Sequence, residues 1–365
     1  MPVVDARRVL GAGGWLGPTE VRVDDGVITA LTPATGVVSD RTIVPGFIDV
    51  QVNGINDIDV AHAEGADWDR LAASLIEQGV TSWCPTLVTN HLDSFEKPLQ
   101  RIFDAQSSSA RSGHQPSIIG AHLEGPFLGG APGAHNRSLI VPVDLAWLAA
   151  LPPVVRLVTL AAEVADAPAA TRLLTERGIV VSIGHSTPSL HEIEQVVAAG
   201  AAMATHLFNG MSGVHHRDPG LAAAALVDDR LFVGLIADLV HVHPLAINLA
   251  FRSKPDGTIV LVTDAVGWEA GLVGEVRIAI RDGAPRLADG TLAGSSVTMD
   301  QVIRNVVGVC GIPLDVAVRA ASANPARLMG CSDRGELAVG GRADMVALDD
   351  ELRIVGVWVG GNQVR

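Results

Sequence analysis

The chain has 365 residues, no Tyr, three Cys and only 4% aromatic residues. The cysteines, Cys84, Cys310 and Cys331, lie far apart and never in Cys-x-x-Cys spacing. This pattern supplies neither the disulfide framework of a small secreted domain nor a cysteine zinc site, and it favours a reducing compartment. We therefore interpret the three thiols as packing residues.

Positive charge is also scarce, because 26 Lys and Arg stand against 40 Asp and Glu, a net charge of −14. Without a basic stripe we expect no nucleic-acid partner, and an anionic membrane would repel this surface. The N-terminal stretch MPVVDARRVLGAGGWLG lacks the apolar core of a signal peptide, and no apolar run approaches the ~18 residues that span a bilayer. These absences predict a soluble, cytoplasmic protein.

Small aliphatic residues are abundant, and they bring the apolar content to 48%, which suits parallel strands buried on both faces. Apolar runs of strand length recur along the middle of the chain, at 43–52, 80–87, 117–124, 156–163, 179–186, 202–208, 232–242 and 258–266. Helical patterns such as ADWDRLAASLIEQG lie between most of them. Eight such units predict a (β/α)₈ barrel, whose usual size is ~250 residues. The run Ser107–Ser109 is expected to be a loop.

Both ends of the chain have a different texture. WLGPTEVRVDDGVITALTP alternates apolar and polar residues around Asp-Asp-Gly, which indicates a hairpin, and the C-terminal 31 residues offer three short β runs. Because chain ends of a domain often lie close together, we expect one small β-sandwich domain from residues 1–44 and 331–365, enclosing a catalytic barrel at 45–330.

Polar residues end every predicted strand. They are Gln51 and Asn53, Thr86, Glu124, Glu163, His185, His206, Asp238 and His241, and Asp264. The carboxyl ends of barrel strands meet at the face that carries the active site. Glu, His, His and Asp at equivalent positions of four strands therefore predict a metal site with an acid/base group. Taken singly, each has a simpler interpretation: a hydrogen-bonded His, a turn carboxylate at Glu124, or a helix cap at Asp264.

Several stretches that cover nearly the whole chain in order form a recognisable set: VPGFIDVQVNG, AHLEGPF, IGHSTPS, THLFNGM, GLIADLVHVHP, VTDAV, LAGSSVTM, NPARLMG and GGRADMVALD. Together they resemble the N-acetylglucosamine-6-phosphate deacetylases of the amidohydrolase superfamily. The resemblance implies a metal-dependent amidohydrolase barrel with a β-sandwich built from both termini. It also implies hydrolysis of the N-acetyl group of N-acetyl-D-glucosamine 6-phosphate to glucosamine 6-phosphate and acetate, in amino-sugar catabolism or cell-wall recycling.

The resemblance assigns catalytic roles by position. Glu124, His185 and His206 match the ligands of one divalent metal ion, zinc or iron. Asp264 matches the general base that activates water, and His135 matches a His that polarises the acetyl carbonyl.

It assigns substrate contacts in the same way. Asn209 and Gly210 match contacts to the sugar phosphate, and His241 and Arg217 match the phosphate site. In the family the Arg comes from the neighbouring subunit, so a homodimer is implied.

Two departures, one from most of the superfamily and one from some of the deacetylases, carry further expectations. Gln51 and Asn53 replace the His-x-His pair of most superfamily members, and their amides are weaker transition-metal ligands, so a second tight ion is not expected. His243 is interpreted as a helix-entry residue before Pro244 rather than as a ligand. The glycine-rich loop 129–134 carries no Lys and is expected to be mobile and to close over substrate.

Two alternatives remain open on the residues alone. One is another amidohydrolase reaction, such as cleavage of a cyclic amide or a D-amino-acid derivative; the THLFNGM element and the pair Arg217 and His241 argue against it. The other is a sugar-phosphate sensor on an inactive barrel, which would not need an intact metal site and base.

Overall fold

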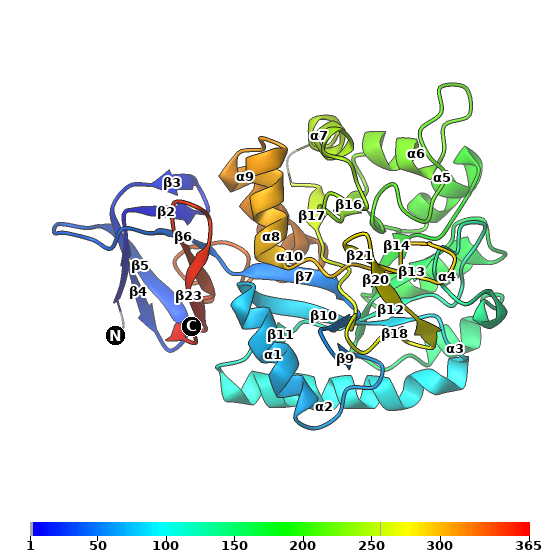
Figure 1. Cartoon of the computed structure of the whole chain (residues 1–365), viewed down its shortest axis with the longest axis horizontal. Coiled ribbons are helices and arrows are strands. Elements are labelled where there is room, and N and C mark those ends of the chain that lie inside the picture. Colours follow the sequence, from blue (N-terminus) through cyan, green and yellow to red (C-terminus); the bar gives the residue numbers. More distant parts are fainter. Residues whose placement is uncertain (1–2, 256) are drawn as a thin grey trace.

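The computed structural model describes residues 3–255 and 257–365. Figure 1 shows two parts, a helix-coated barrel and a smaller β unit that holds both chain termini. Within the described ranges, no helix combines the length and the apolar character required to cross a membrane.

Eight parallel strands form the barrel, and each corresponds to one predicted apolar run. In spatial order they are β7 (Phe47–Val52), β10 (Val80–Val88), β12 (Ala121–Glu124), β13 (Val155–Leu160), β14 (Val180–Ile183), β15 (Met203–Ala204), β16 (Phe232–Leu235) and β17 (Ile259–Leu261). A parallel bridge between Val52 and Ala265 joins the last strand to the first and closes the ring. The predicted barrel is therefore confirmed, and the short β11 (Ser117–Ile118) adds to the edge of β10.

Helices follow most strands and pack outside the barrel (Figure 1). They are α1 (Asp67–Glu77), α2 (Glu96–Ser112), α3 (Leu145–Ala149), α4 (Ala167–Glu176), α5 (Leu190–Ala198), α6 (Leu221–Val227), α7 (Pro244–Ser253), α8 (Met299–Arg304), α9 (Leu314–Ala320) and α10 (Ala323–Leu328). As predicted, His243 is the N-cap of α7 and accepts a hydrogen bond from the Leu245 amide at 3.2 Å. The expected loop at Ser107–Ser109 is wrong, because these residues lie inside α2.

The β unit contains strands from both ends of the chain. One sheet runs β1 (Val3–Ala6), β4 (Thr19–Asp24), β5 (Val27–Pro33); the other runs β24 (Asn362–Gln363), β23 (Ile354–Val359), β22 (Met345–Leu348), β6 (Thr42–Pro45), β2 (Arg8–Gly11), β3 (Gly14–Leu16). The predicted hairpin turns at Asp25 and Gly26, which both have positive φ. A sandwich built from both termini is thus confirmed, while the boundaries at 44/45 and 330/331 stay a prediction.

A segment after β17 covers the mouth of the barrel. It forms two short hairpins, β18 (Leu272–Val273) with β19 (Val276–Arg277), and β20 (Ala279–Arg281) with β21 (Ala284–Arg286). Figure 1 shows these hairpins in front of the barrel strands. The Gly274 amide donates to Asp59 at 2.9 Å, which ties the segment to β9 (Ile58–Asp59), the partner of β8 (Gly54–Ile55).

Candidate active site

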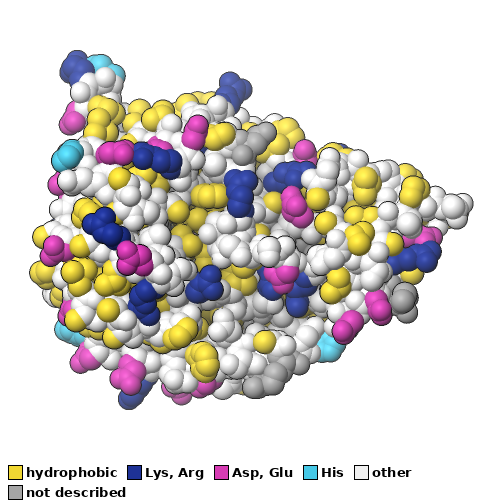
Figure 2. Space-filling model, turned by 180° about the vertical axis from the view of Figure 1, so that it is seen from behind, with side chains coloured by type: hydrophobic (Ala, Val, Ile, Leu, Met, Phe, Trp, Pro, Cys, Tyr) yellow, Lys and Arg dark blue, Asp and Glu magenta, His cyan; other side chains and the backbone are white. Residues whose placement is uncertain are grey.

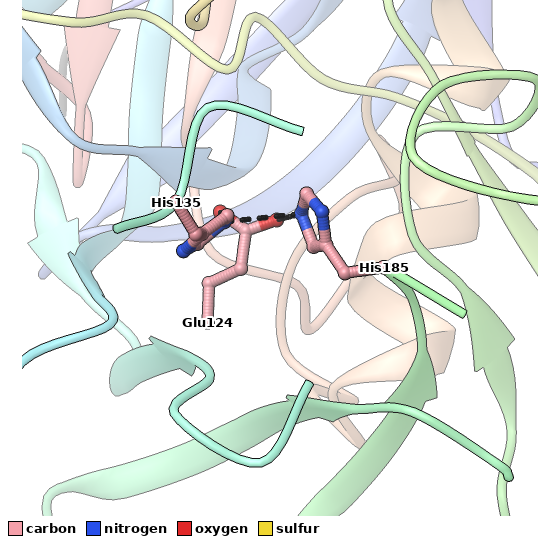
Figure 3. Close-up of side chains that lie close together, drawn as sticks. All are labelled: Glu124, His135 and His185. Atoms are coloured by element: carbon pink, nitrogen blue, oxygen red, sulfur yellow. Dashed lines mark hydrogen bonds and ion pairs between the residues drawn. The ribbon is translucent and has the colours of Figure 1, made fainter. Parts of the chain in front are cut away.

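Side chains from the carboxyl ends of β12, β14 and β15 meet at one buried point, while β13 lies between the first two of these strands. Glu124 is the last residue of β12, and its Oε1 lies 3.1 Å from His185 Nε2 and 2.9 Å from His206 Nε2. The two imidazole Nε2 atoms are 3.2 Å apart. Figure 3 shows the Glu124 carboxylate facing the His185 ring, with His135 beside it. The structure therefore brings together all three predicted metal ligands.

An unusual backbone conformation places these side chains. His185 and His206 come two residues after the ends of β14 and β15 and have φ of 51° and 27°, and Asp264 after β17 has φ of 49°. Residues other than Gly seldom adopt positive φ, and such strain gathers at functional sites. The strands themselves thus remain regular while the residue beyond each one turns toward the mouth.

Hydrogen bonds orient both imidazoles. His185 Nδ1 lies 3.2 Å from the Ala131 carbonyl oxygen, and His206 Nδ1 lies 3.1 Å from the Asn209 carbonyl oxygen. Each ring can donate through Nδ1 and so present Nε2 to Glu124, as in metal sites where a second partner orients the ligand.

The charges at this point favour a cation. Burial by itself would raise the pKa of Glu124, but hydrogen bonds from His185 and His206 hold it well below its usual range. Burial would likewise lower the pKa of His206, yet the Glu124 carboxylate raises it to about 9. The Glu124 carboxylate thus stabilises positive charge at this point, and with two imidazoles that give up their Nε2 protons to a metal it forms a ligand set that fits a divalent ion.

His135 joins the same cluster. Its Nε2 lies 3.1 Å from His185 Nε2 and 3.9 Å from Glu124 Oε2, and its Nδ1 lies 2.8 Å from the Thr89 hydroxyl. Burial, followed by the charge of His185, lowers the pKa of His135 to about 3, so the ring is neutral. Glu124, His135 and His185 also form a group whose ligand atoms all lie within 4.8 Å. The geometry suits His135 as a further ligand as well as a contact to a substrate carbonyl.

Asp264 receives two amide donors. Its Oδ1 accepts from Asn53 Nδ2 at 2.7 Å and from Gln51 Nε2 at 3.1 Å, and Gln51 Nε2 also lies 3.1 Å from Glu124 Oε1. Burial, and then the nearby Glu124 charge, raise the pKa of Asp264 to about 7. Gln51 and Asn53 therefore turn N–H donors toward the carboxylates.

A cavity of about 210 Å³ opens above this cluster. One side is polar and includes Asn209, Gly210 and His241, with His241 Nδ1 held 2.7 Å from Asp238. The other side is aliphatic and includes Val88, Val266, Val273, Val276 and Ala293. The structure thus places three of the four predicted substrate contacts at the cavity.

Arg217 is the fourth, and it lies elsewhere. It is exposed in the loop between β15 and α6, where its guanidinium lies 2.9 Å from His216 Nε2, and it does not line the cavity. Figure 1 shows this loop rising above α6, and Figure 2 shows a projection whose tip carries His and Lys or Arg side chains. Arg217 is therefore not part of the cavity of its own chain.

Sequence reasoning missed parts of the site. The hairpins over the mouth were not predicted, although Asp282-Gly283 between short β runs is a hairpin signal. Thr89 was also missed, since no local pattern marks a hydroxyl that contacts a His 46 residues away.

Comparisons with known proteins identify the family. A model of the amidohydrolase family matches residues 42–364. The chain is 37% identical to N-acetylgalactosamine-6-phosphate deacetylase from Escherichia coli O157:H7, covering 98% of each chain. It is 39% identical to human N-acetylglucosamine-6-phosphate deacetylase over 89% of this chain and 83% of that one.

A solved structure shares the whole fold. It is a variant N-acetyl-D-glucosamine-6-phosphate deacetylase from Mycobacterium smegmatis in complex with N-acetyl-D-glucosamine 6-phosphate, with a TM-score of 0.91, 31% identity, and coverage of 99% of this chain and 98% of that one. Family model, relatives and fold coincide over almost the entire length, so the chain belongs to the amidohydrolase family, in the branch that holds the N-acetylglucosamine-6-phosphate deacetylases.

Proposed function

We propose that the protein is a cytoplasmic hydrolase that removes the acetyl group from N-acetyl-D-glucosamine 6-phosphate and releases glucosamine 6-phosphate and acetate. The observation that carries this proposal is the convergence of Glu124, His185 and His206 beside Asp264 at the floor of one cavity. The relatives that carry the same activity in their names match this chain along most of its length.

Glu124, His185 and His206 would hold one divalent ion, zinc or iron. When bound, such an ion lowers the pKa of water and polarises a carbonyl group. The N–H groups of Gln51 and Asn53 face the carboxylates, which supports a single ion, because a donor N–H repels a second cation.

The proton transfers fall to Asp264. As a carboxylate it accepts a proton from the attacking water, and as an acid it returns that proton to the amine that leaves. Burial and the Glu124 charge raise the pKa of Asp264, which favours this carboxylate for taking up a proton. His135 would donate a hydrogen bond to the developing oxyanion, and its contact with the Thr89 hydroxyl and its neutral ring support this role.

The sugar phosphate would occupy the polar side of the cavity. Asn209, Gly210 and His241 line it, and no Arg or Lys is among its lining residues. A guanidinium paired with phosphate is a strong, charge-assisted contact. We therefore assign the phosphate to His241 together with Arg217 of a second copy, in a homodimer.

The decisive experiment measures acetate release and metal content on the same preparation. We expect about one tightly held ion per chain and release of acetate from N-acetylglucosamine 6-phosphate. N-acetylgalactosamine 6-phosphate is the second substrate to test, because a relative named for it matches 98% of this chain. No acetate from either substrate by the metal-loaded protein would reject the proposal and favour a sensor or a different amide hydrolase.

A further inference from the structure

We propose that Glu163 is a positioning residue for this reaction, with its carboxylate fastening the glycine-rich loop 129–134 against the turn that carries His185. The inference rests on the proposed function. Glu163 lies just beyond β13, between the strand ends that supply Glu124 and His185, yet it does not belong to the cluster that they form.

One carboxylate joins three segments of the chain. Glu163 Oε1 accepts hydrogen bonds from the Gly130 amide at 2.8 Å and from the Thr187 amide at 2.7 Å. Its Oε2 accepts from the Ser186 hydroxyl, which in turn accepts from the Ala162 amide at 3.0 Å. Both carboxylate oxygens are therefore engaged, and Glu163 acts through the loop rather than as a metal ligand.

The glycines of the loop permit this approach. A Cβ at position 129 would lie 2.0 Å from Glu163 Oε1, and a Cβ at position 130 would lie 2.1 Å from Thr187 Oγ1. Neither Gly129 nor Gly130 has a positive φ, so these glycines are needed for space and not for a left-handed backbone. The glycine content led us to expect a mobile lid, but Gly129 and Gly130 are also needed because they leave room for Glu163 and Thr187.

The fastened loop contacts the predicted metal ligand His185 and leads to His135. The Gly129 amide donates to the His185 carbonyl at 2.9 Å, and the Ala131 carbonyl oxygen lies 3.2 Å from His185 Nδ1. The loop leads directly to His135, whose Nε2 is 3.1 Å from His185 Nε2. Loss of the hydrogen bonds that Glu163 accepts would therefore loosen both the orientation of the His185 ring and the position of His135 beside it.

Two substitutions at Glu163 separate positioning from charge. Glu163→Ala removes every acceptor, and we expect kcat to fall by about tenfold or more, because small misplacements of catalytic groups are costly. Glu163→Gln keeps a carbonyl oxygen for the Gly130 and Thr187 amides and offers its NH₂ to Ser186. It should restore kcat to within about threefold of the wild type, with an unchanged pH profile. An equal fall in both variants would overturn the proposal, because it would show that the charge itself is required.

A reciprocal variant tests the same contact from the loop. Gly129→Ala pushes the carboxylate away and should reproduce the loss in Glu163→Ala. Matched controls are Gly13→Ala, where a Cβ meets nothing within 4 Å, and Glu192→Ala, which removes a capping carboxylate from α5. Both control variants, Gly13→Ala and Glu192→Ala, should keep the wild-type kcat. The activity of the wild-type protein tests the proposed function separately. If the wild type is active and either Glu163→Ala or Gly129→Ala is equally active, the positioning role is rejected while the proposed function stands.

Discussion

At the scale of single residues, the site depends on opposed electrostatic environments for two carboxylates. Two imidazoles stabilise the charge of Glu124, whereas burial and the Glu124 charge disfavour the charge of Asp264. When the environment separates the pKa values of two carboxylates, one stays ionised and the other can exchange a proton. This contrast supports Glu124 as a ligand and Asp264 as the base.

Asp264→Asn tests that division. The substitution keeps the shape of the side chain but removes proton acceptance, so we expect kcat to fall by about 10²–10⁴ while metal content stays at the wild-type level. Steady-state rates and elemental analysis measure the two quantities. Asp57→Asn is the control, because Asp57 is exposed and paired with Arg70 at 2.6 Å. Near-normal turnover in Asp264→Asn would assign the proton transfer to another group.

At the scale of elements, the hairpin of β18 and β19 shapes the aliphatic side of the cavity. Val273 and Val276 line the cavity from this hairpin, and Val88 at the end of β10 faces them near Glu124. The acyl methyl is the main apolar group of the proposed substrate. We therefore expect this hairpin to limit the length of the acyl chain.

Val276→Ala should widen that side. The ratio of kcat/KM for the N-propionyl to the N-acetyl substrate is expected to rise about fourfold or more, since one buried methylene contributes about 0.8 kcal/mol. Ile280→Ala is the matched control, because Ile280 lies in the same covering segment but is 43% exposed and does not line the cavity. An unchanged ratio in Val276→Ala would place the acyl group elsewhere.

At the scale of the whole molecule, two features link distant parts. The loop that carries Arg217 rises above α6, and Arg217 does not line the cavity of its own chain. The buried Asp49 on β7, the first barrel strand, accepts a hydrogen bond at 2.6 Å from the hydroxyl of Thr263, which follows β17, the last barrel strand. The first feature concerns assembly, and the second concerns barrel closure.

Arg217→Ala tests the assembly. Loss of one partner of a desolvated charge pair costs about 2–5 kcal/mol, so kcat/KM for the phosphorylated sugar should fall at least about tenfold. The rate on unphosphorylated N-acetylglucosamine should hardly change. The control is Arg22→Ala, an exposed Arg of the β unit paired with Glu20. Equal losses on both substrates would make Arg217 structural.

Mixing variants tests whether the arginine acts across subunits. Co-expressed Arg217→Ala and Asp264→Asn chains can form hybrid dimers in which one site has an intact base and receives an intact arginine. We expect activity above that of either variant alone. No such gain in dimers shown to be mixed would mean that Arg217 acts within its own chain.

Asp49 makes stability depend on pH. Burial raises its pKa from 3.8 to about 7, although the Thr263 hydroxyl opposes this shift. The folded chain therefore keeps a proton that the unfolded chain has lost, and stability falls as pH rises between these values. Relative to the wild type, Asp49→Asn should gain about 2 to 3 kcal/mol in the free energy of unfolding from pH 5 to pH 8. Denaturant titration of both proteins at both pH values measures this difference in the free energy of unfolding. The same difference between Asp49→Asn and the wild type at pH 5 and pH 8 would contradict the prediction.

The sequence by itself determined the order of elements and the identity of the strand-end residues. Barrel strands buried on both faces must be apolar until they reach the mouth, so their ends stand out along the chain, as at Glu124 and His185. Helical periodicity is harder to recognise in polar stretches than in apolar ones, because few apolar residues mark the buried face. For this reason Ser107–Ser109 was not predicted to belong to α2.

Only the tertiary structure decided how those residues are used. The turn of His206 and Asp264 into the left-handed region and the pairing of Gln51 with carboxylates 73 and 213 residues away have no local signature. The fastening of the loop 129–134 by Glu163 is of the same kind. These features arise because barrel closure brings distant strand ends within hydrogen-bond distance of one another. Buried polar groups at these ends then form hydrogen bonds with the neighbouring strand ends and loops.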